Sequence, residues 1–182
     1  MKGLTDDFIA IDTNVFRHIR SARNADNHIT ELLTSGISHG TVLLVDSENI
    51  ITYEYGQVLI DENGRPQFNA EEDEDPAVMR LLSYWMNAAP KEVVNISTNA
   101  NKELQSIIHD VIPLPKVGER KYSSTKVDRT FVYVAFAKDR VLISNDKTDI
   151  INRRDALISA VKSLNLGNAD VITSECAHTR IQ

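Results

Sequence analysis

The chain of 182 residues is 42% hydrophobic and 25% charged, a composition typical of one globular domain, and we expect residues 1–182 to form that single domain. Its net charge of −6 argues against a protein that coats nucleic acid, although the acidic run 71–75 supplies most of the excess. No apolar run approaches the roughly 20 residues that cross a bilayer, no signal-peptide pattern is visible, and Cys176 is the sole cysteine. We therefore expect a cytoplasmic protein with no membrane segment and no internal disulfide.

Short apolar runs alternate with helix-like segments along the chain. The first half of the pattern predicts a strand at 8–11, a helix from about 15 interrupted at 24–27, a helix at 29–33, a strand at 41–45, a helix at 50–60 and a turn at 61–66. The middle of the chain predicts a helix at 77–86, a strand at 93–96, a helix capped by Ser97 or Thr98 that runs to 109, and a polar loop at 113–127. The last part predicts a helix at 128–138, a strand at 141–143, a helix at 154–164 and a strand at 169–173. Such alternation favours βαβ units, and hence a three-layer α/β/α sandwich with a mostly parallel central sheet.

Four acidic residues stand out by their positions in this pattern. Asp12 and Asp146 come at the ends of predicted strands that are far apart in sequence. Glu54 lies on the helix after the second strand, and Asp128 begins a mostly apolar helix. Because ligands of open α/β sheets bind beyond the carboxyl ends of the strands, we expect all four acids to meet at that edge.

Carboxylates that lie close together repel one another unless they are protonated or a cation neutralises them. Oxygen ligands without His or Cys suit Mg²⁺ or Mn²⁺, which support phosphodiester hydrolysis. Simpler roles are also open for each residue taken alone: a helix cap for Asp12, a first-turn acid for Asp128, a surface position for Glu54 and a polar turn for Asp146. Two further acids, Asp46 and Glu48, compete for the role of Glu54.

Taken together, these motifs resemble those of the PIN domain nucleases. The resemblance rests on Ile-Ala-Ile-Asp-Thr-Asn at 9–14, on Glu54 within 50–55, on Asp128 and on Leu-Ile-Ser-Asn-Asp at 142–146, and it spans nearly the whole chain. It implies a Rossmann-like fold and an Mg²⁺ or Mn²⁺ site that cleaves single-stranded or structured RNA. By motif position the metal-site acids would be Asp12, Glu54, Asp128 and Asp146. Thr13, Asn14 and Ser144 would orient them by hydrogen bonding, with Asp149 as a further supporting acid.

A basic stretch precedes the third acid. Its members are Lys116, Arg120, Lys121, Lys126 and Arg129, with Tyr122 among them. We predict that Lys121, Tyr122, Lys126 and Arg129 bind nucleic acid, the cations on phosphates and the ring on an unpaired base. A solvated loop without a ligand is the simpler alternative. The chain also departs from compact PIN toxins, because it carries an insertion-like region around 61–125 and places Arg129 directly beside Asp128.

The leading hypothesis is therefore a metal-dependent endoribonuclease of toxin or RNA-processing type, with an inhibitory protein partner and a homo-oligomer left open. The alternative is a catalytically weak PIN-like module that only binds nucleic acid or protein, which the position of Arg129 motivates. A phosphatase of the haloacid-dehalogenase type needs a second Asp two residues after Asp12, where this chain has Asn14. The sequence contains no Gly-rich nucleotide-binding loop.

Overall fold

The computed structural model describes residues 8–17, 27–60, 76–97, 100–119 and 121–181. Outside these ranges lie the turn predicted at 61–66, the acidic run 71–75, the proposed cap Thr98 and the cation Arg120. The strands are β1 (Phe8–Ile11), β2 (Val42–Asp46), β3 (Lys91–Val94), β4 (Val141–Ile143) and β5 (Asp170–Ile172). The helices are α1 (Asn14–Arg17), α2 (Asn27–Ser38), α3 (Ile50–Leu59), α4 (Pro76–Ala88), α5 (Lys102–Val111), α6 (Tyr122–Ala137), α7 (Arg154–Val161) and α8 (Ser174–Ile181), with single 3₁₀ turns η2 (Ile151–Arg153) and η3 (Lys162–Leu164).

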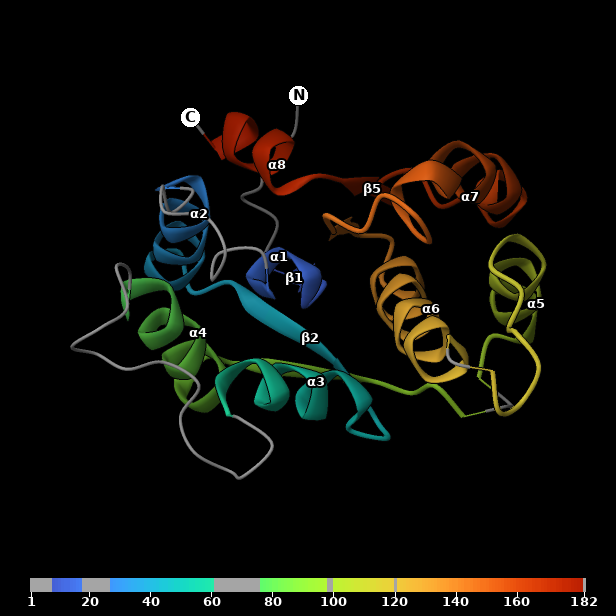
Figure 1. The fold of residues 1–182 in the computed structure, drawn as a ribbon. Helices are drawn as coiled ribbons and strands as arrows, with labels where there is room; N and C mark the ends of the chain where they lie inside the picture. Colours follow the sequence, from blue (N-terminus) through green and yellow to red (C-terminus); the bar gives the residue numbers. More distant parts are fainter. Residues whose placement is uncertain (1–7, 18–26, 61–75, 98–99, 120, 182) are drawn as a thin grey trace.

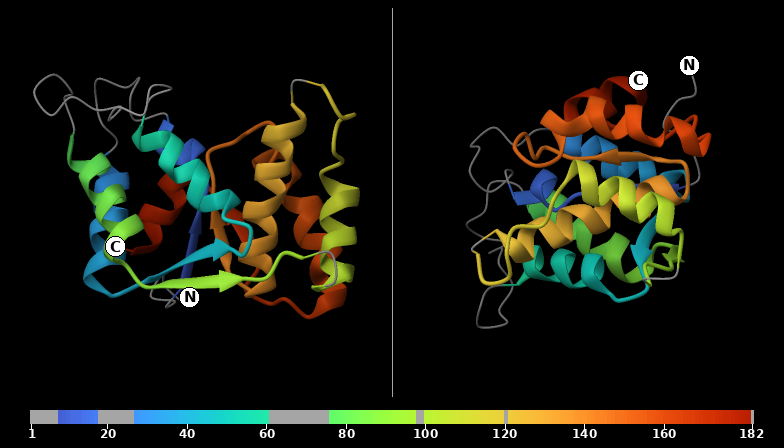
Figure 2. Two further views of the ribbon diagram at one scale, coloured as in Figure 1. Left: turned by 90° about the horizontal axis from the view of Figure 1, so that it is seen from below. Right: turned by 90° about the vertical axis from the view of Figure 1, so that its right-hand side faces the viewer.

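The strands form one sheet in the order β3-β2-β1-β4-β5, and every described pair of neighbours is parallel. Helices α2, α4 and α8 lie on one side of it, whereas α5, α6 and α7 lie on the other (Figures 1 and 2). This is the three-layer α/β/α sandwich that the sequence predicts.

The strand order determines where a ligand can bind. From β1 the chain moves outward through β2 to β3, then returns to the other side of β1 to form β4 and β5. The direction of winding therefore reverses between β1 and β4, and their loops diverge at the carboxyl ends. In open α/β sheets this topological switch point is where the ligand crevice forms.

Helix α6 is the central element of the core. Residues 130–136 are all buried, although they cover the whole circumference of the helix. This follows from its position, because α6 packs on β1, β2 and β4 and is covered by α3 and α5. Tyr55 of α3 packs between the rings of Phe16 and Phe131, so apolar contacts join α1, α3 and α6 directly beneath the switch point.

Several predicted boundaries were wrong for identifiable reasons. Helix α6 begins at Tyr122 rather than at Asp128, since the polar residues of its first turns lie on a partly exposed end that carries no apolar pattern. Strand β3 begins and ends two residues earlier than predicted. Its pairing with β2 determines the bounds of this edge strand, whereas its hydrophobicity does not, since the apolar Val93 is 62% exposed.

Two helix termini also differ from the sequence prediction. The cap of α5 is Asn101, whose side chain accepts a hydrogen bond from the Leu104 amide, and not Ser97. Helix α8 was not predicted at all. None of the described helices is long and apolar enough to cross a bilayer.

Candidate metal centre

The backbone brings the ends of β1 and β4 together. The amide of Asp12 donates to the carbonyl of Ile143 at 2.8 Å, one residue beyond the last register pair of β1 and β4. The amide of Ser144 donates in turn to the carbonyl of Ile172 at 2.9 Å. Continued sheet pairing thus fixes both residues at the carboxyl edge, at the switch point.

The Asp12 carboxylate is buried and well supplied with donors. Ser144 Oγ donates to Oδ2 at 2.7 Å, the Asn14 amide donates to Oδ1 at 3.2 Å, and Thr13 Oγ1 lies 3.5 Å from Oδ1. Burial nevertheless raises the pKa of Asp12 above its ordinary value, more than these hydrogen bonds lower it. The bond from the Asn14 amide caps the short helix α1, as the simpler reading of Asp12 expected, and the other oxygen, Oδ2, accepts from Ser144 and from the Asn14 side chain. Asp12 is therefore not one of the three closest acids.

Asn14 links the first strand end to the second. Its side-chain Nδ2 donates to Asp12 Oδ2 at 3.2 Å and to Asp146 Oδ2 at 3.4 Å. A partial positive charge therefore lies between two carboxylates that would otherwise face each other directly.

A tight turn after β4 folds two acids onto the same spot. Asp146 Oδ1 accepts hydrogen bonds from the amides of Thr148 at 2.8 Å and Asp149 at 3.0 Å, and the Asp146 amide donates to Ser144 Oγ at 3.0 Å. The polar turn that was the simpler reading of Asp146 is thus present. It orients the Asp146 carboxylate and draws Asp149 back beside it.

Asp128 approaches the turn from the second turn of α6. Asp128, Asp146 and Asp149 each offer one carboxylate oxygen, and these three oxygens lie within 4.8 Å of one another. Burial raises the pKa of Asp128 from its ordinary 3.8 to about 8, and the charges of Asp12, Asp146, Asp149 and Glu54 add to this effect. Because the helix begins at Tyr122, Asp128 is neither a cap nor a first-turn acid.

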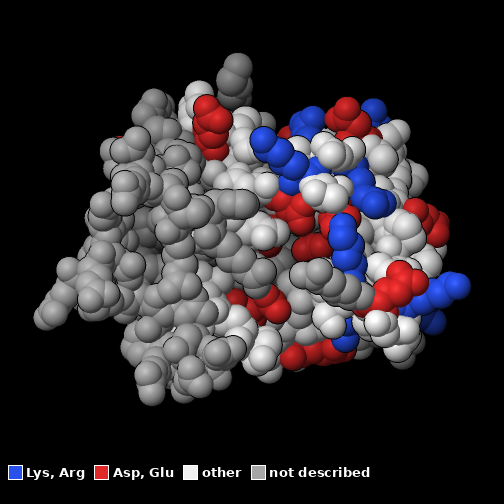
Figure 3. Space-filling view, in the orientation of Figure 1, with Lys and Arg blue, Asp and Glu red and all other residues white. Residues whose placement is uncertain are grey.

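The acids line a pocket of about 280 Å³. Its walls are Thr13, Asn14, Glu54, Ser123, Ser124, Val127, Asp128, Asp146 and Asp149. Glu54 reaches it from α3 but is not one of the three closest acids. Asp and Glu side chains gather between α1 and α6 on the face shown in Figure 3, with Lys and Arg side chains beside them.

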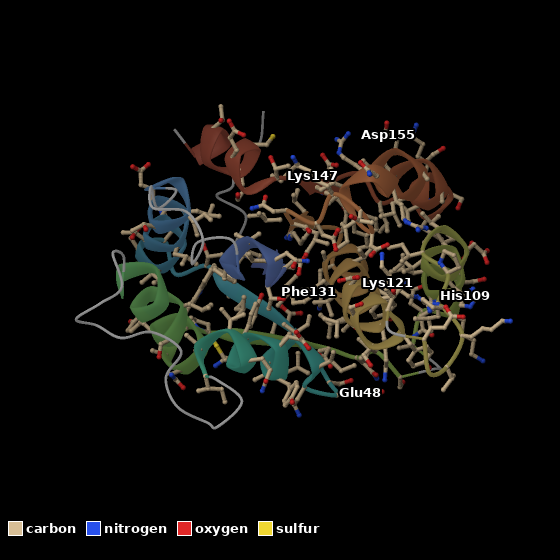
Figure 4. All side chains as sticks on the ribbon, in the orientation of Figure 1. Glu48, His109, Lys121, Phe131, Lys147 and Asp155 are labelled. Atoms are coloured by element: carbon tan, nitrogen blue, oxygen red, sulfur yellow. The ribbon has the colours of Figure 1, made fainter. Side chains whose placement is uncertain are left out.

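Among the described residues, two cations contact this cluster, both through Asp149. Lys121 Nζ lies 3.8 Å from Asp149 Oδ2, and the guanidinium of Arg153 lies 4.0 Å from Oδ1. Lys121 is 63% exposed, and Figure 4 shows it beside α6. No described cation forms an ion pair with Asp128, so its burial among like charges remains uncompensated.

The basic residues predicted to bind nucleic acid do not form a loop. Tyr122, Lys126 and Arg129 belong to α6 and line a second pocket, on the other side of the helix from Asp128. Burial lowers the pKa of the Arg129 guanidinium below its ordinary value. Of the predicted group, Lys121 is the one that the structure brings to the acids.

Asp46 and Glu48 are not part of the cluster. Asp46 accepts hydrogen bonds from the amides of Glu48, Ile50 and Ile51, so its buried carboxylate caps helix α3. Glu48 lines the second pocket. Glu54 is therefore the acid from this part of the chain that reaches the candidate site.

Sequence reasoning underestimated three residues. Asp149 was predicted only as a supporting acid, yet it belongs to the closest trio; its spacing from Asp146 on a turn was the available signal. Ser123 and Ser124 line the pocket because α6 begins before them. No apolar periodicity could have indicated that early start.

Comparisons with known proteins leave the family open. No protein-family model matches the chain, and no curated protein or solved structure matches it either. The geometry described above is therefore the basis for any functional statement.

Proposed function

We propose that this chain is a PIN-like, divalent-metal-dependent endoribonuclease that hydrolyses phosphodiester bonds. The observation that carries the proposal is the convergence of Asp128, Asp146 and Asp149 within 4.8 Å beside the switch point of the sheet. Structural acids are usually paired with cations or capped by amides, whereas Asp128 is buried among like charges with a pKa raised to about 8.

The donor set fits Mg²⁺ or Mn²⁺. Every candidate ligand is a carboxylate oxygen, and the pocket contains neither His nor Cys among its described walls. Asp128, Asp146 and Asp149 would hold the ion, with Glu54 at its margin. Asp12 is not a wall of the pocket and would support the site through Asn14 and Ser144. A bound cation of this kind supplies Lewis-acid activation of water and neutralises charge at the phosphate.

The surrounding residues would hold this arrangement in place. The Ser144 hydroxyl donates to the Asp12 carboxylate and accepts from the Asp146 backbone amide, and so couples the two strand ends. Asn14 donates to the same two carboxylates and so bridges them. Lys121, exposed at the rim, is positioned to contact a phosphate oxygen of an RNA strand that enters the pocket.

A cleavage assay with a 5′-fluorescein-labelled single-stranded RNA tests this function. We expect the wild-type chain to cleave the RNA with Mn²⁺ or Mg²⁺ and not with EDTA, and Asp128→Asn and Asp146→Asn to lose cleavage while remaining folded by circular dichroism. The matched control is Asp110→Asn, an exposed acid of α5, which should cleave like wild type. Undiminished cleavage by both cluster variants would refute the assignment.

The alternative of a binding module without catalysis has lost part of its support. It was motivated by the bulky cation next to Asp128, yet Arg129 lines the second pocket and not the acidic one. Thermal melting with and without Mn²⁺ separates the two functions. The nuclease requires an upward shift of the melting temperature, whereas the binding module predicts none.

Other sequence predictions accompany this proposal without further support from the geometry. They are a toxin or RNA-processing role, an inhibitory protein partner, a homo-oligomer, a single domain and a cytoplasmic setting. The last follows from the lone Cys176.

A further inference from the structure

A second pocket lies next to the acidic one, on the other side of α6. Its volume is about 370 Å³, near the lower end of the roughly 300–1,000 Å³ of small-molecule sites. Its walls are Glu48, Ile50, Ile96, Gln105, Ile108, Leu114, Tyr122, Lys126, Arg129, Thr130 and Tyr133. Nothing in the proposed chemistry uses this pocket.

Helical spacing explains why the two pockets are separate yet close. Tyr122, Lys126, Arg129 and Tyr133 follow one another at intervals of three or four residues, so they share one face of α6. Ser124 and Asp128 share the opposite face, which lines the acidic pocket. The two sites are therefore separated by about the width of a helix, roughly 10–12 Å with side chains.

The walls of the second pocket suit a flat, partly polar ring. Ile50, Ile96 and Ile108 supply apolar surface, and Tyr122 supplies an aromatic ring at the end of α6 nearest the acids. The polar wall is held in place, because Tyr133 Oη lies within hydrogen-bond distance of the carbonyls of Asn95 and Ala100 and donates its one hydrogen between them. Gln105 Nε2 donates to the Ala100 carbonyl as well, at 2.9 Å. A preformed site of this kind loses little entropy when it binds.

The two cations of the pocket outnumber its one acid, Glu48, and indicate an anionic ligand. Lys126 and Arg129 both line it, and neither forms an ion pair with a described residue. Arg129 is only partly exposed, so its guanidinium is desolvated without a compensating carboxylate. Phosphate oxygens are the usual partners of such a guanidinium.

We propose that this pocket binds one nucleotide of the RNA strand whose backbone is cleaved at the acidic pocket. Its base would lie against the isoleucines and stack on Tyr122, while Lys126 and Arg129 contact its phosphate. Glu48, which Figure 4 places at the end of α3 nearest α6, would accept a hydrogen bond from an exocyclic amino group. Among the pyrimidines such an acceptor would favour cytosine, which carries an amino group at position 4, over uracil, which carries a carbonyl oxygen there. This inference rests on the proposed function, since it takes RNA as the substrate.

Fluorescence anisotropy in EDTA measures binding without cleavage. The probes are eight-nucleotide oligocytidylate and oligouridylate labelled with fluorescein, titrated at several salt concentrations. We expect Tyr122→Leu to weaken binding about tenfold without changing the salt dependence, because it removes stacking alone. We expect Arg129→Gln and Lys126→Gln each to weaken binding and to reduce the slope of log K against log salt by about 0.7.

One control variant and one further test variant complete the experiment. Lys162→Gln removes the same charge at an exposed position in η3 and should bind like wild type. Glu48→Gln should narrow the preference for oligocytidylate over oligouridylate. Lys126 is exposed, so its substitution keeps the test valid even if the Arg129 variant fails to fold.

The outcomes distinguish this inference from the proposed function. The nucleotide pocket would be overturned, even if the wild type cleaves RNA, by wild-type affinity in all three pocket variants, Tyr122→Leu, Arg129→Gln and Lys126→Gln. It would also be overturned if Lys162→Gln lost as much affinity as the pocket variants do. Pocket-dependent binding by a protein that never cleaves RNA would uphold the pocket and overturn the nuclease. Equal affinity for the two oligonucleotides would overturn the selection by Glu48, and a wild type that binds neither would overturn the pocket altogether.

Discussion

Substitution of Asp128 by Asn should change how the stability of the metal-free protein depends on pH. In the folded protein the pKa of Asp128 is about 8, against an ordinary value of 3.8. The folded state therefore holds this proton more tightly than the unfolded chain does. The stability that Asp128 confers is complete below the unfolded pKa and is lost as the pH rises through the folded pKa.

The size of the effect follows from the linkage relation. Each pKa unit corresponds to 1.36 kcal/mol, so between about pH 5 and pH 8 one such group lowers the free energy of unfolding by about 1.4 kcal/mol per pH unit. The total loss would be on the order of 4 kcal/mol across that range, a large part of the 5–15 kcal/mol typical of a domain. Asn has nearly the same shape and cannot ionise, so Asp128→Asn should lack this contribution.

Urea unfolding in EDTA at several pH values, followed by circular dichroism, measures the difference. We expect Asp128→Asn to gain stability over the wild type, and the gain to grow with pH until it levels off above about pH 8. Asp110→Asn, which alters an exposed carboxylate, should follow the wild-type curve. A stability difference between Asp128→Asn and wild type that stays constant with pH would refute the claim that uncompensated charge surrounds this residue.

Three further substitutions test the scaffold of the site by the same urea assay. Ser144→Ala removes the 2.7 Å hydrogen bond to Asp12 and should cost about 1.5–3 kcal/mol, the range for a bond to a charged group; an unchanged midpoint would mean that the hydroxyl does not bind a carboxylate. Tyr55→Phe removes the hydrogen bond to the buried Ile11 carbonyl at the end of β1 and should cost about 1–3 kcal/mol, and a stabilised variant would contradict this contact. Lys121→Gln breaks an exposed ion pair and should change stability by less than about 1 kcal/mol, whereas a larger loss would show that Lys121 has a structural role.

The layer architecture could be predicted from the sequence because it follows from local signals. Buried parallel strands are continuous apolar runs, and their alternation with helical segments restricts the fold to few topologies. The strand-end positions of Asp12 and Asp146 follow from the same runs. The two residues are adjacent because β1 pairs with β4. The sequence does not show this pairing directly; it is suggested only by the general rule that parallel strands end at one edge of a sheet.

The remaining parts of the site depend on contacts that local sequence does not encode. The start of α6 determines which of its residues face the acids, and its polar first turns carry no hydrophobic period. For that reason Arg129 was expected beside the acids, and it lies instead on the side of the second pocket. Asp46 resembles Asp12 in sequence, because both follow a predicted strand, and both accept an amide hydrogen bond at the start of a helix. The structure separates them: three amides donate to the Asp46 carboxylate, and no described side chain links it to the acids of the pocket.

Anomalous scattering from a crystal soaked in Mn²⁺ tests the central claim most directly. The account predicts a manganese peak at a position within coordination distance of carboxylate oxygens from Asp128, Asp146 and Asp149, absent in crystals of Asp146→Asn. A saturating soak that leaves this position without anomalous density, or that places the ion elsewhere on the chain, would contradict the assignment of the switch-point acids as a metal centre.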